Sequence, residues 1–351
     1  MFIKKAAILL LLVGRDGAAA ARHRKRHNNN NEALESTLDN NEAQESILDE
    51  DMIFLMRKLQ QSMSMPAANL PIPSPTPPPA TPAPTFPCNL TPQERATEFR
   101  KMALKITPAA TLNNSNSPQA KALRWLSFED EMSPTLCPGD GEVQQRYIMA
   151  AFYFATGGGT WTECNAPTGS SQSAIDAANQ KCTIVATKYP VKPDRTPGTD
   201  AWLTSVPVCR WGGLTCHSDD RRGGTLDQID IEKNNLSGSL IDEIGDLPNL
   251  RFLILEQGNI GGNIPESIGN LPLLIVDFDY NKFTGPIPQS LYNVRSLQQL
   301  DLNDNQMTGT ISSNVANWNR MTFLQLNNNS FNGNIPPQVG SLNRLSEYTH
   351  I

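Results

Sequence analysis

The feature that most constrains this chain is an internal repeat with a period of 24 residues, broken once by a step of 23. A unit this short cannot bury an apolar face alone, so neighbouring units must stack and share one continuous core. Residues 225–351 are therefore predicted to form a solenoid of five complete coils and a truncated sixth. The coils begin at Leu226, Leu250, Leu273, Leu297, Met321 and Leu345.

Each repeat has apolar residues at its first, fourth and sixth positions, as in Leu297, Leu300 and Leu302. The alternation of the last two is typical of a short strand with one buried face. Four repeats then carry an asparagine eight places after their start: Asn234, Asn281, Asn305 and Asn329. Such an asparagine can satisfy backbone groups of its own coil and of a neighbouring coil. Gly258 stands there in the second repeat, which predicts a gap in this asparagine ladder.

Glycine and proline mark the return path of each repeat. A glycine stands where the chain must turn tightly: Gly238, Gly262, Gly285, Gly309 and Gly333. Three coils continue with Ile-Pro, which precludes an ordinary helix there. The complete pattern, L-x-x-L-x-L-x-x-N-x-L-x-G-x-I-P, resembles the plant-type leucine-rich repeats of plant receptor ectodomains and polygalacturonase-inhibiting proteins. This resemblance implies an α/β solenoid, a right-handed coil with a parallel β-sheet on its concave side.

Helices are predicted in the region 88–224, before the repeats. The sequence Thr91–Glu94 carries a capping-box start, from which a helix is expected to run to about Ile106. Ser117 followed by proline starts a second helix, and Asp140 starts a third that ends at a triple glycine. A solenoid exposes the apolar end of its first coil, so these helices are expected to cover it.

Six cysteines lie between the proline-rich segment and the repeats: Cys88, Cys137, Cys164, Cys182, Cys209 and Cys216. An even number in this position fits disulfides formed in an oxidising compartment, and the spacing alone leaves their connectivity open. A zinc site is the competing interpretation, but paired C-x-x-C units and suitably spaced histidines are missing from the sequence.

The sequence CRWGGLTC after Trp202 resembles the N-terminal cap of plant-type leucine-rich-repeat proteins. The runs at 117–130 and 145–161 are similar to a group of algal, diatom-type proteins of this class. The cap resemblance implies that Cys209 pairs with Cys216. We further expect Cys164 and Cys182 to close a loop inserted in the cap, which leaves Cys88 with Cys137.

The N-terminal segments are expected to lie outside the folded domain. A basic start, an apolar run at 6–13 and small residues after it have the layout of a secretory signal peptide, assigned to 1–21. The run is too short to span a membrane. Residues 22–65, basic and then acidic, are expected to be disordered, although the basic run 22–27 could alternatively be a nuclear or acidic-surface tag. The proline-rich residues 66–87 are expected to form an extended stalk.

The strand residues that alternate with the leucines are expected to face outward on the concave sheet. The first column is Asp230, Ile254, Asp277, Asp301 and Gln325. The second is Glu232, Glu256, Asp279, Asn303 and Asn327. The third is Gln228, Phe252, Ile275, Gln299 and Phe323. All of these except Gln299, Asn303 and Asn327 are our candidate ligand-binding residues, an acidic ridge beside an exposed apolar strip. The alternative is that the acidic residues only keep the sheet soluble.

The sequence argues against catalysis. Of the four histidines, two stand at 23 and 27 and one is the penultimate residue. A phosphate-binding loop and metal-ligand spacings are also missing from the sequence. We therefore expect no enzyme, no cofactor and no metal, and a calcium site on the aspartate column is the weaker alternative because strands hold carboxylates in a flat row. The net charge of −6 also argues against a nucleic-acid partner.

These observations predict a secreted, cell-surface or matrix protein that binds a protein or cell-wall glycan through its concave sheet. Candidate glycosylation sites are Asn89, Asn113, Asn235 and Asn328. The alternatives are an inhibitor of wall-degrading enzymes, an ectodomain fragment of a receptor-like kinase, and a structural wall or matrix protein. The truncated sixth coil lacks a cap, so it predicts either a fragment of a longer protein or a dimerisation surface at that end.

Overall fold

A computed structural model describes residues 88, 90–184, 197–217 and 224–346. These residues belong to one compact unit, Ala80–Ile351. The predicted signal peptide, disordered segment and proline-rich stalk lie outside the described residues, as does Asn89. Within the described part of the chain, no helix is long and apolar enough to cross a membrane.

Five α-helices precede the solenoid in the described residues: α2 (Pro92–Ala103), α3 (Ala109–Asn113), α4 (Pro118–Phe128), α5 (Gly141–Ala155) and α6 (Gln172–Asn179). The predicted capping box forms at α2, where Thr91 and Glu94 each accept a hydrogen bond from the other's backbone amide. The helix α2 ends at Ala103, before the predicted end at Ile106, because the next residues form tighter turns. These turns lead into α3, a separate helix that was not predicted.

The helix α5 is the centre of the helical region and packs against α4. Its predicted apolar stripe is buried: Val143, Tyr147, Ile148, Ala151 and Phe152. Arg146 is also fully buried, and its guanidinium binds both carboxylate oxygens of Asp130 at 2.8 and 2.6 Å. It lies 5.3 Å from the ring centre of Trp125 and 5.0 Å from that of Trp211. The ion pair and these cation–π contacts compensate the buried charge.

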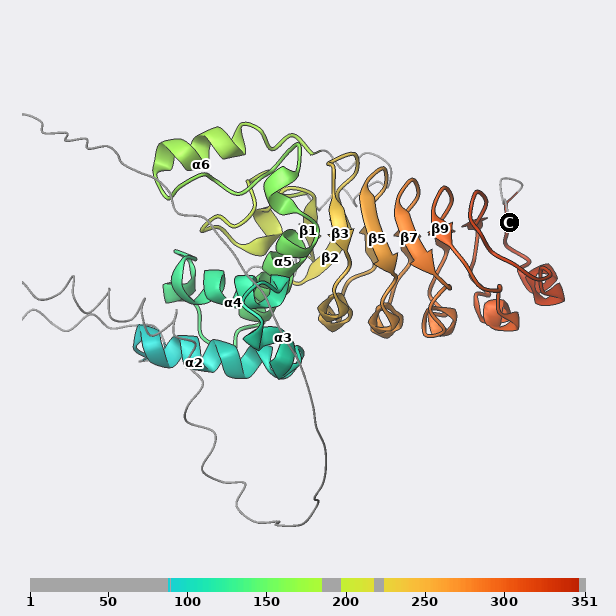
Figure 1. The fold of residues 1–351 in the computed structure, drawn as a ribbon, viewed down its shortest axis with the longest axis horizontal. Helices are drawn as coiled ribbons and strands as arrows, with labels where there is room; N and C mark the ends of the chain where they lie inside the picture. Colours follow the sequence, from blue (N-terminus) through green and yellow to red (C-terminus); the bar gives the residue numbers. More distant parts are fainter. Residues whose placement is uncertain (1–87, 89, 185–196, 218–223, 347–351) are drawn as a thin grey trace, which may run out of the picture. The chain divides into compact units, whose positions relative to one another are not determined.

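The helices cover the N-terminal end of the solenoid, as expected (Figure 1). The amide of Ser237, in the first coil, donates to the carbonyl of Thr156 just after α5 at 2.9 Å. The buried carboxylate of Glu243, also in the first coil, accepts from the Thr107 hydroxyl at 2.6 Å and from the Gln119 amide at 2.9 Å. Polar bonds as well as apolar packing therefore hold the first coil to the helices.

The main sheet has six strands in the order β1-β2-β4-β6-β8-β10. Their bounds are β1 Leu214–Cys216, β2 Leu226–Asp230, β4 Phe252–Ile254, β6 Ile275–Asp277, β8 Gln299–Asp301 and β10 Phe323–Gln325. The strand β1 comes from the cap and pairs antiparallel with β2, whereas the five coil strands are parallel and in register. The predicted parallel sheet is confirmed, and the cap adds an edge strand to it.

A second parallel sheet, β3-β5-β7-β9, was not predicted. It consists of β3 Ser237–Ser239, β5 Asn259–Asn263, β7 Lys282–Gly285 and β9 Gln306–Met307. The return path beyond it is 3-10 helix: η5 Asp242–Asp246, η6 Glu266–Asn270, η7 Leu291–Asn293, η8 Ser313–Asn317 and η9 Pro337–Ser341. This agrees with the expectation that proline precludes an ordinary helix in the three Ile-Pro coils, whereas the 3-10 form itself was not predicted. Glycine at positive φ begins this return, with Gly285 at 72°.

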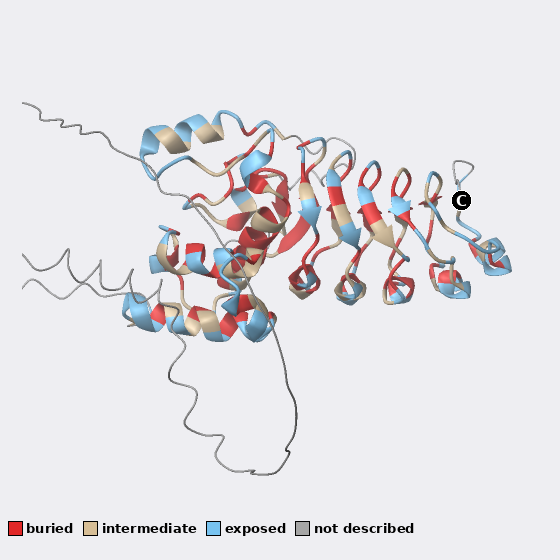
Figure 2. Cartoon of the chain, in the orientation of Figure 1, coloured by how far each residue is buried: buried red, intermediate tan, exposed pale blue. Residues whose placement is uncertain are grey.

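The core runs through the coils and continues into the helices (Figure 2). All five residues of β2 are buried, whereas only the central residue of β10 is buried. The concave strand of the fifth coil is therefore less buried than that of the first.

Candidate recognition surface

The three predicted columns form as expected on the main sheet. Gln228 pairs with Phe252, Asp230 with Ile254, and this register continues through β6, β8 and β10. In-register parallel strands place equivalent side chains of neighbouring coils about 4.8 Å apart on one face. The columns are therefore continuous rows of side chains rather than scattered residues.

The expected exposure of these columns is wrong for most of their residues. Ile254 and Ile275, predicted as part of an exposed apolar strip, are 0% and 8% exposed, and Phe252 is half-buried. The acidic residues Asp230 and Asp277 are buried too. Closely spaced side chains on an inward-curving sheet lean together and cover one another. Alternation along a strand predicts which side chains point to this face, but it does not predict how far neighbouring coils cover them. Half-buried positions on the columns are Glu232, Phe252, Gln299, Phe323, Gln325 and Asn327.

Polar side chains on this face are hydrogen-bonded to their neighbours. The amide of Asn303 donates to Asp301 at 2.6 Å and to Gln325 at 3.2 Å, which links two adjacent coils. Gln228 donates to Asp230 at 3.0 Å in the same strand. These bonds hold the carboxylates in fixed positions, so the face is pre-organised.

Glu232 has an altered acidity. Burial, then a hydrogen bond with Glu256, then the charges of Glu256 and Asp230 raise its pKa to about 8, although Lys233 opposes them. The Lys233 ammonium lies 3.6 Å from the Glu232 carboxylate. Glu232 therefore keeps its proton at neutral pH and can donate it to Glu256.

Three carboxylates converge in the middle of the sheet. Oxygens of Glu256, Asp277 and Asp279 lie within 4.8 Å of one another, and all three residues are buried. A flat row of carboxylates is expected from parallel strands, but adjacent coils bring these three side chains together. This arrangement concentrates negative potential where it would attract a cationic group.

The asparagine ladder explains the spacing of the coils. The Asn281 side chain donates to the Leu255 carbonyl at 2.6 Å and accepts from the Ile260 amide at 3.1 Å, both in the preceding coil. Asn305 and Asn329 repeat this geometry. A Cβ at Gly258 would lie 2.7 Å from the Asn281 carboxamide oxygen. The predicted gap at Gly258 therefore leaves room for the neighbouring ladder residue.

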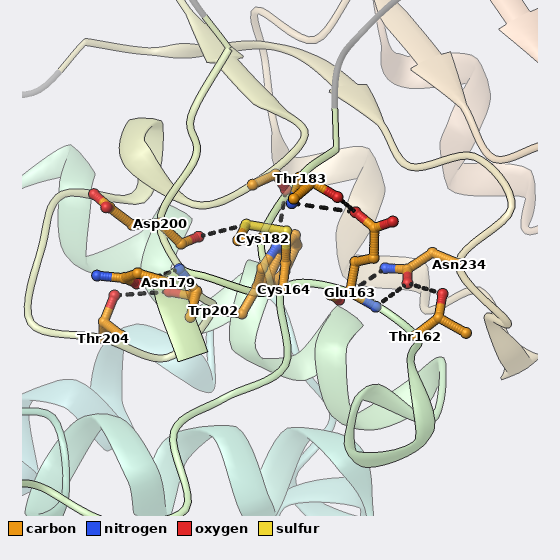
Figure 3. The surroundings of a disulfide bond; sticks show 12 residues. Thr162, Glu163, Cys164, Asn179, Cys182, Thr183, Asp200, Trp202, Thr204 and Asn234 are labelled. Carbon is orange, nitrogen blue, oxygen red and sulfur yellow. Dashed lines mark hydrogen bonds between the residues drawn. A yellow bond between two sulfur atoms is a disulfide. The ribbon is translucent and has the colours of Figure 1, made fainter. Parts of the chain in front are cut away.

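The first ladder residue is satisfied by the cap rather than by a coil (Figure 3). Asn234 accepts from the Thr162 hydroxyl at 2.8 Å and from the Glu163 amide at 2.7 Å, and it donates to the Glu163 carbonyl at 3.1 Å. The next residue, Cys164, forms a disulfide with Cys182. Residues 162–164 thus take the place of a coil before the first one, a role that the sequence analysis missed.

The structure joins the six cysteines in the three expected pairs, Cys88–Cys137, Cys164–Cys182 and Cys209–Cys216. The loop between Cys164 and Cys182 carries the helix α6 (Gln172–Asn179), which buries none of its residues. The disulfide, together with a hydrogen bond from the Ala201 amide to the Asn179 side chain at 2.8 Å, therefore holds this segment to the cap.

Three candidate glycosylation sites are described, and all are exposed: Asn113, Asn235 and Asn328. The Asn235 amide donates to the Thr160 carbonyl at 3.0 Å, and the Asn328 amide donates to Asp304 at 3.0 Å. Asn113 instead accepts, from Arg100 at 2.5 Å. A glycan bond forms at the amide nitrogen, so Asn113 needs the least rearrangement of these bonds.

A rim column that the sequence analysis did not single out borders the concave face. It contains the residue just before each ladder position: Lys233, Gln257, Tyr280, Asp304 and Asn328. All five have positive φ, between 49° and 55°. Each belongs to a repeat at a fixed offset from the ladder, which is the signal that could have identified the column.

Comparison with known proteins agrees with these repeats. A family model described as Leucine Rich Repeat matches residues 296–318 and 320–342. Phytosulfokine receptor 1 of Arabidopsis thaliana is 33% identical over 109 residues, which are 30% of this chain and 8% of the receptor. The chain thus spans less than a tenth of that relative's length.

Similar solved structures also include plant proteins. The plant peptide hormone receptor RGFR1 in complex with RGF2 is 38% identical, covering 34% of this chain and 19% of that chain with a TM-score of 0.34. The BIR3–SERK2 complex from Arabidopsis thaliana is 27% identical, covering 38% of this chain and 70% of that chain with a TM-score of 0.36. The repeat pattern and the family model show that this chain carries leucine-rich repeats, and the chain is similar to plant receptors in this region.

Proposed function

We propose that this protein is an extracellular recognition module that binds a partner through its concave sheet and catalyses no reaction. The observation that carries the proposal is the in-register acidic face, in which Glu256, Asp277 and Asp279 bring their carboxylates within 4.8 Å of one another. Fixed charges of one sign on a pre-organised sheet favour a partner of opposite charge and steer its approach.

The partner is a basic protein segment. The similarity to Phytosulfokine receptor 1 supports a receptor-like role. Half-buried aromatic side chains at Phe252 and Phe323 flank the acidic columns and offer apolar contact. A cell-wall glycan remains the second class of ligand, since aromatic rings also stack on sugar faces.

The remaining assignments are part of the same proposal. Residues 1–21 are removed on secretion, the three disulfides form in the secretory pathway, and Asn113 carries a glycan. The C-terminal coil, where Ile335 is 56% exposed, is the surface through which two copies would associate.

The test is selection of binders from a random peptide library displayed on phage, with the full chain purified from the medium of secreting cells as bait. We expect selected peptides to be rich in lysine and arginine. Asp277→Asn combined with Asp301→Asn should weaken their binding at least tenfold. The matched control, Asp242→Asn with Glu266→Gln, removes two exposed carboxylates from the return path. Equal loss in both double variants, or no basic consensus, would refute recognition by the concave sheet.

A further inference from the structure

We propose that Tyr280 and Asp304, at the rim of the concave sheet, form a binding site for one arginine or lysine side chain of the partner. The inference rests on the proposed function and deepens it, because it names one contact and its chemistry. The two residues occupy equivalent positions in adjacent coils, and neither belongs to the columns chosen from the sequence.

The exposure of Tyr280 is the first observation. It is one of three large hydrophobic side chains that are exposed in the described residues, at 54%, and the other two, Leu104 and Ile335, are aliphatic. An exposed aromatic ring offers a π face to a cation and adds little to the core.

The backbone at Tyr280 supplies the second observation. All rim-column residues are left-handed, and Tyr280 has φ of 49°. Asparagine and aspartate tolerate this conformation well, and two other coils use them there, Asp304 and Asn328. A bulky ring is a poor choice at such a position unless it has another use. Folding stability therefore does not explain tyrosine here, whereas recognition does.

Charge supplies the third observation. The charge of the Asp304 carboxylate raises the pKa of the Tyr280 phenol most, followed by burial, the charge of Asp279, a hydrogen bond with Asp304 and the charge of Asp301. The phenol therefore stays protonated and the ring lies in negative potential. Asn328 donates to one Asp304 oxygen at 3.0 Å and fixes that carboxylate.

Together these groups fit a guanidinium or ammonium. A cation stacked on the Tyr280 ring places its N–H groups toward the Asp304 carboxylate, which combines a cation–π contact with a charge-assisted hydrogen bond. Arginine matches best, because its planar group can stack and donate at once.

The experiment measures binding of a fluorescein-labelled peptide of four Arg-Gly units to the full chain by fluorescence anisotropy. We expect Tyr280→Asn and Asp304→Asn each to weaken binding at least fivefold. Asp242→Asn makes the same charge change on the exposed return path and should alter binding less than twofold. If Asp242→Asn weakens binding as much as Asp304→Asn, peptide binding depends on the net charge of the protein and the rim site is refuted.

A second measurement separates binding from folding. Tyr280→Asn replaces a strained residue by one that suits the backbone, so its melting temperature should rise by about 1–3 °C while its affinity falls. Tyr280→Phe keeps the ring and should retain most of the affinity. Unchanged peptide binding in Tyr280→Asn refutes the rim site.

The concave face is tested in the same assay by Asp277→Asn. If Asp277→Asn and Asp301→Asn weaken the binding of library-selected peptides but Tyr280→Asn does not, recognition by the concave sheet is supported and the rim site is refuted. If Tyr280→Asn weakens the binding of these peptides and the two concave variants do not, the rim site is supported and recognition by the concave sheet is refuted.

Discussion

The first and fifth coils have the same repeat pattern but opposite surroundings. The first coil, 226–249, carries seven charged residues and continues into the helices and the cap, whereas the fifth, 321–344, carries one, Arg344. All of β2 is buried, but β10 has half-buried residues on either side of its centre. A repeat sequence thus specifies how a coil is built, and its neighbours determine how rigidly it is held.

The difference extends to the polar contacts. In the first coil Asn234 and Glu243 are both bonded to groups of the cap or helices. The fifth coil makes its ladder bonds through Asn329 to the fourth coil. With Ile311 of the fourth coil it also lines an open pocket of about 350 Å³, whose lining includes Phe331 and Ile335. We therefore expect the N-terminal coils to be the most stable part of the solenoid and the fifth coil to open first.

The largest expected effect is loss of the disulfide next to the first ladder residue. Cys164→Ser with Cys182→Ser should lower the free energy of unfolding by about 2–4 kcal/mol, because the loop that ends beside Asn234 loses its closure. Hydrogen exchange should accelerate in β2 and β4, and calorimetry should give a lower Tm. Equal acceleration in β10 would contradict a local role in holding the first coil.

The ladder allows the same substitution to be compared in two coils. Asn305→Ala should cost about 1–3 kcal/mol, because the buried Phe278 carbonyl and Phe283 amide lose their partner. Asn329→Ala should cost less, since that residue is half-buried and water can replace the lost bonds. Denaturant unfolding of both variants measures the two costs. Equal costs would show that position in the array does not matter.

Glu232 provides a pH test of the first coil. Its pKa is raised from an ordinary 4.5 to about 8, so the folded state holds a proton that the unfolded state releases. Its contribution to stability is fully present below about pH 4.5 and is lost as the pH rises toward 8. Glu232→Gln should remove this loss and stabilise the protein at pH 8 by about 1–2 kcal/mol, after allowance for solvent screening.

The control is the same measurement at pH 4, where wild type and Glu232→Gln should differ little. Thermal unfolding of both proteins across this range gives the difference directly. A variant that is less stable than wild type at pH 8 would show that the Glu232 carboxylate is charged and favourably paired.

The smallest effect is expected in the fifth coil. Ile335→Ser should change the unfolding free energy by less than about 0.5 kcal/mol, because the side chain is 56% exposed. The buried equivalent in the second coil, Ile264, is 3% exposed, and Ile264→Ser should cost several-fold more. Chemical denaturation compares the pair. A large cost at Ile335 would mean that another surface covers it in solution.

Periodicity made most of the fold predictable. The leucine positions fix which side of each strand is buried, the asparagines fix the ladder, and the Ile-Pro pairs exclude ordinary helix on the return path. These are local patterns that recur in most of the coils, so each copy supports the same interpretation. The helix starts at Thr91 and Ser117 were equally local, and both side chains form the expected caps.

The concave face was predictable in register but not in exposure. Alternation identifies which side chains point to that face, and the strand pairs agree. The accessibility of Ile254 and Asp277 depends on neighbours from other coils and on the curvature of the sheet. The sequence of a single repeat specifies neither of these. The second sheet was missed for a similar reason, because its strands are short and gain their pairing only from adjacent coils.

The sequence by itself determined a solenoid of 24-residue coils with a continuous apolar core and an asparagine ladder. Tertiary structure alone decided that residues 162–164 act as a preceding coil, that Glu243 joins the first coil to the helices, and that three carboxylates converge. The physical reason is that the repeat fixes short-range geometry, whereas burial, shared protons and charge density arise between segments far apart in the chain.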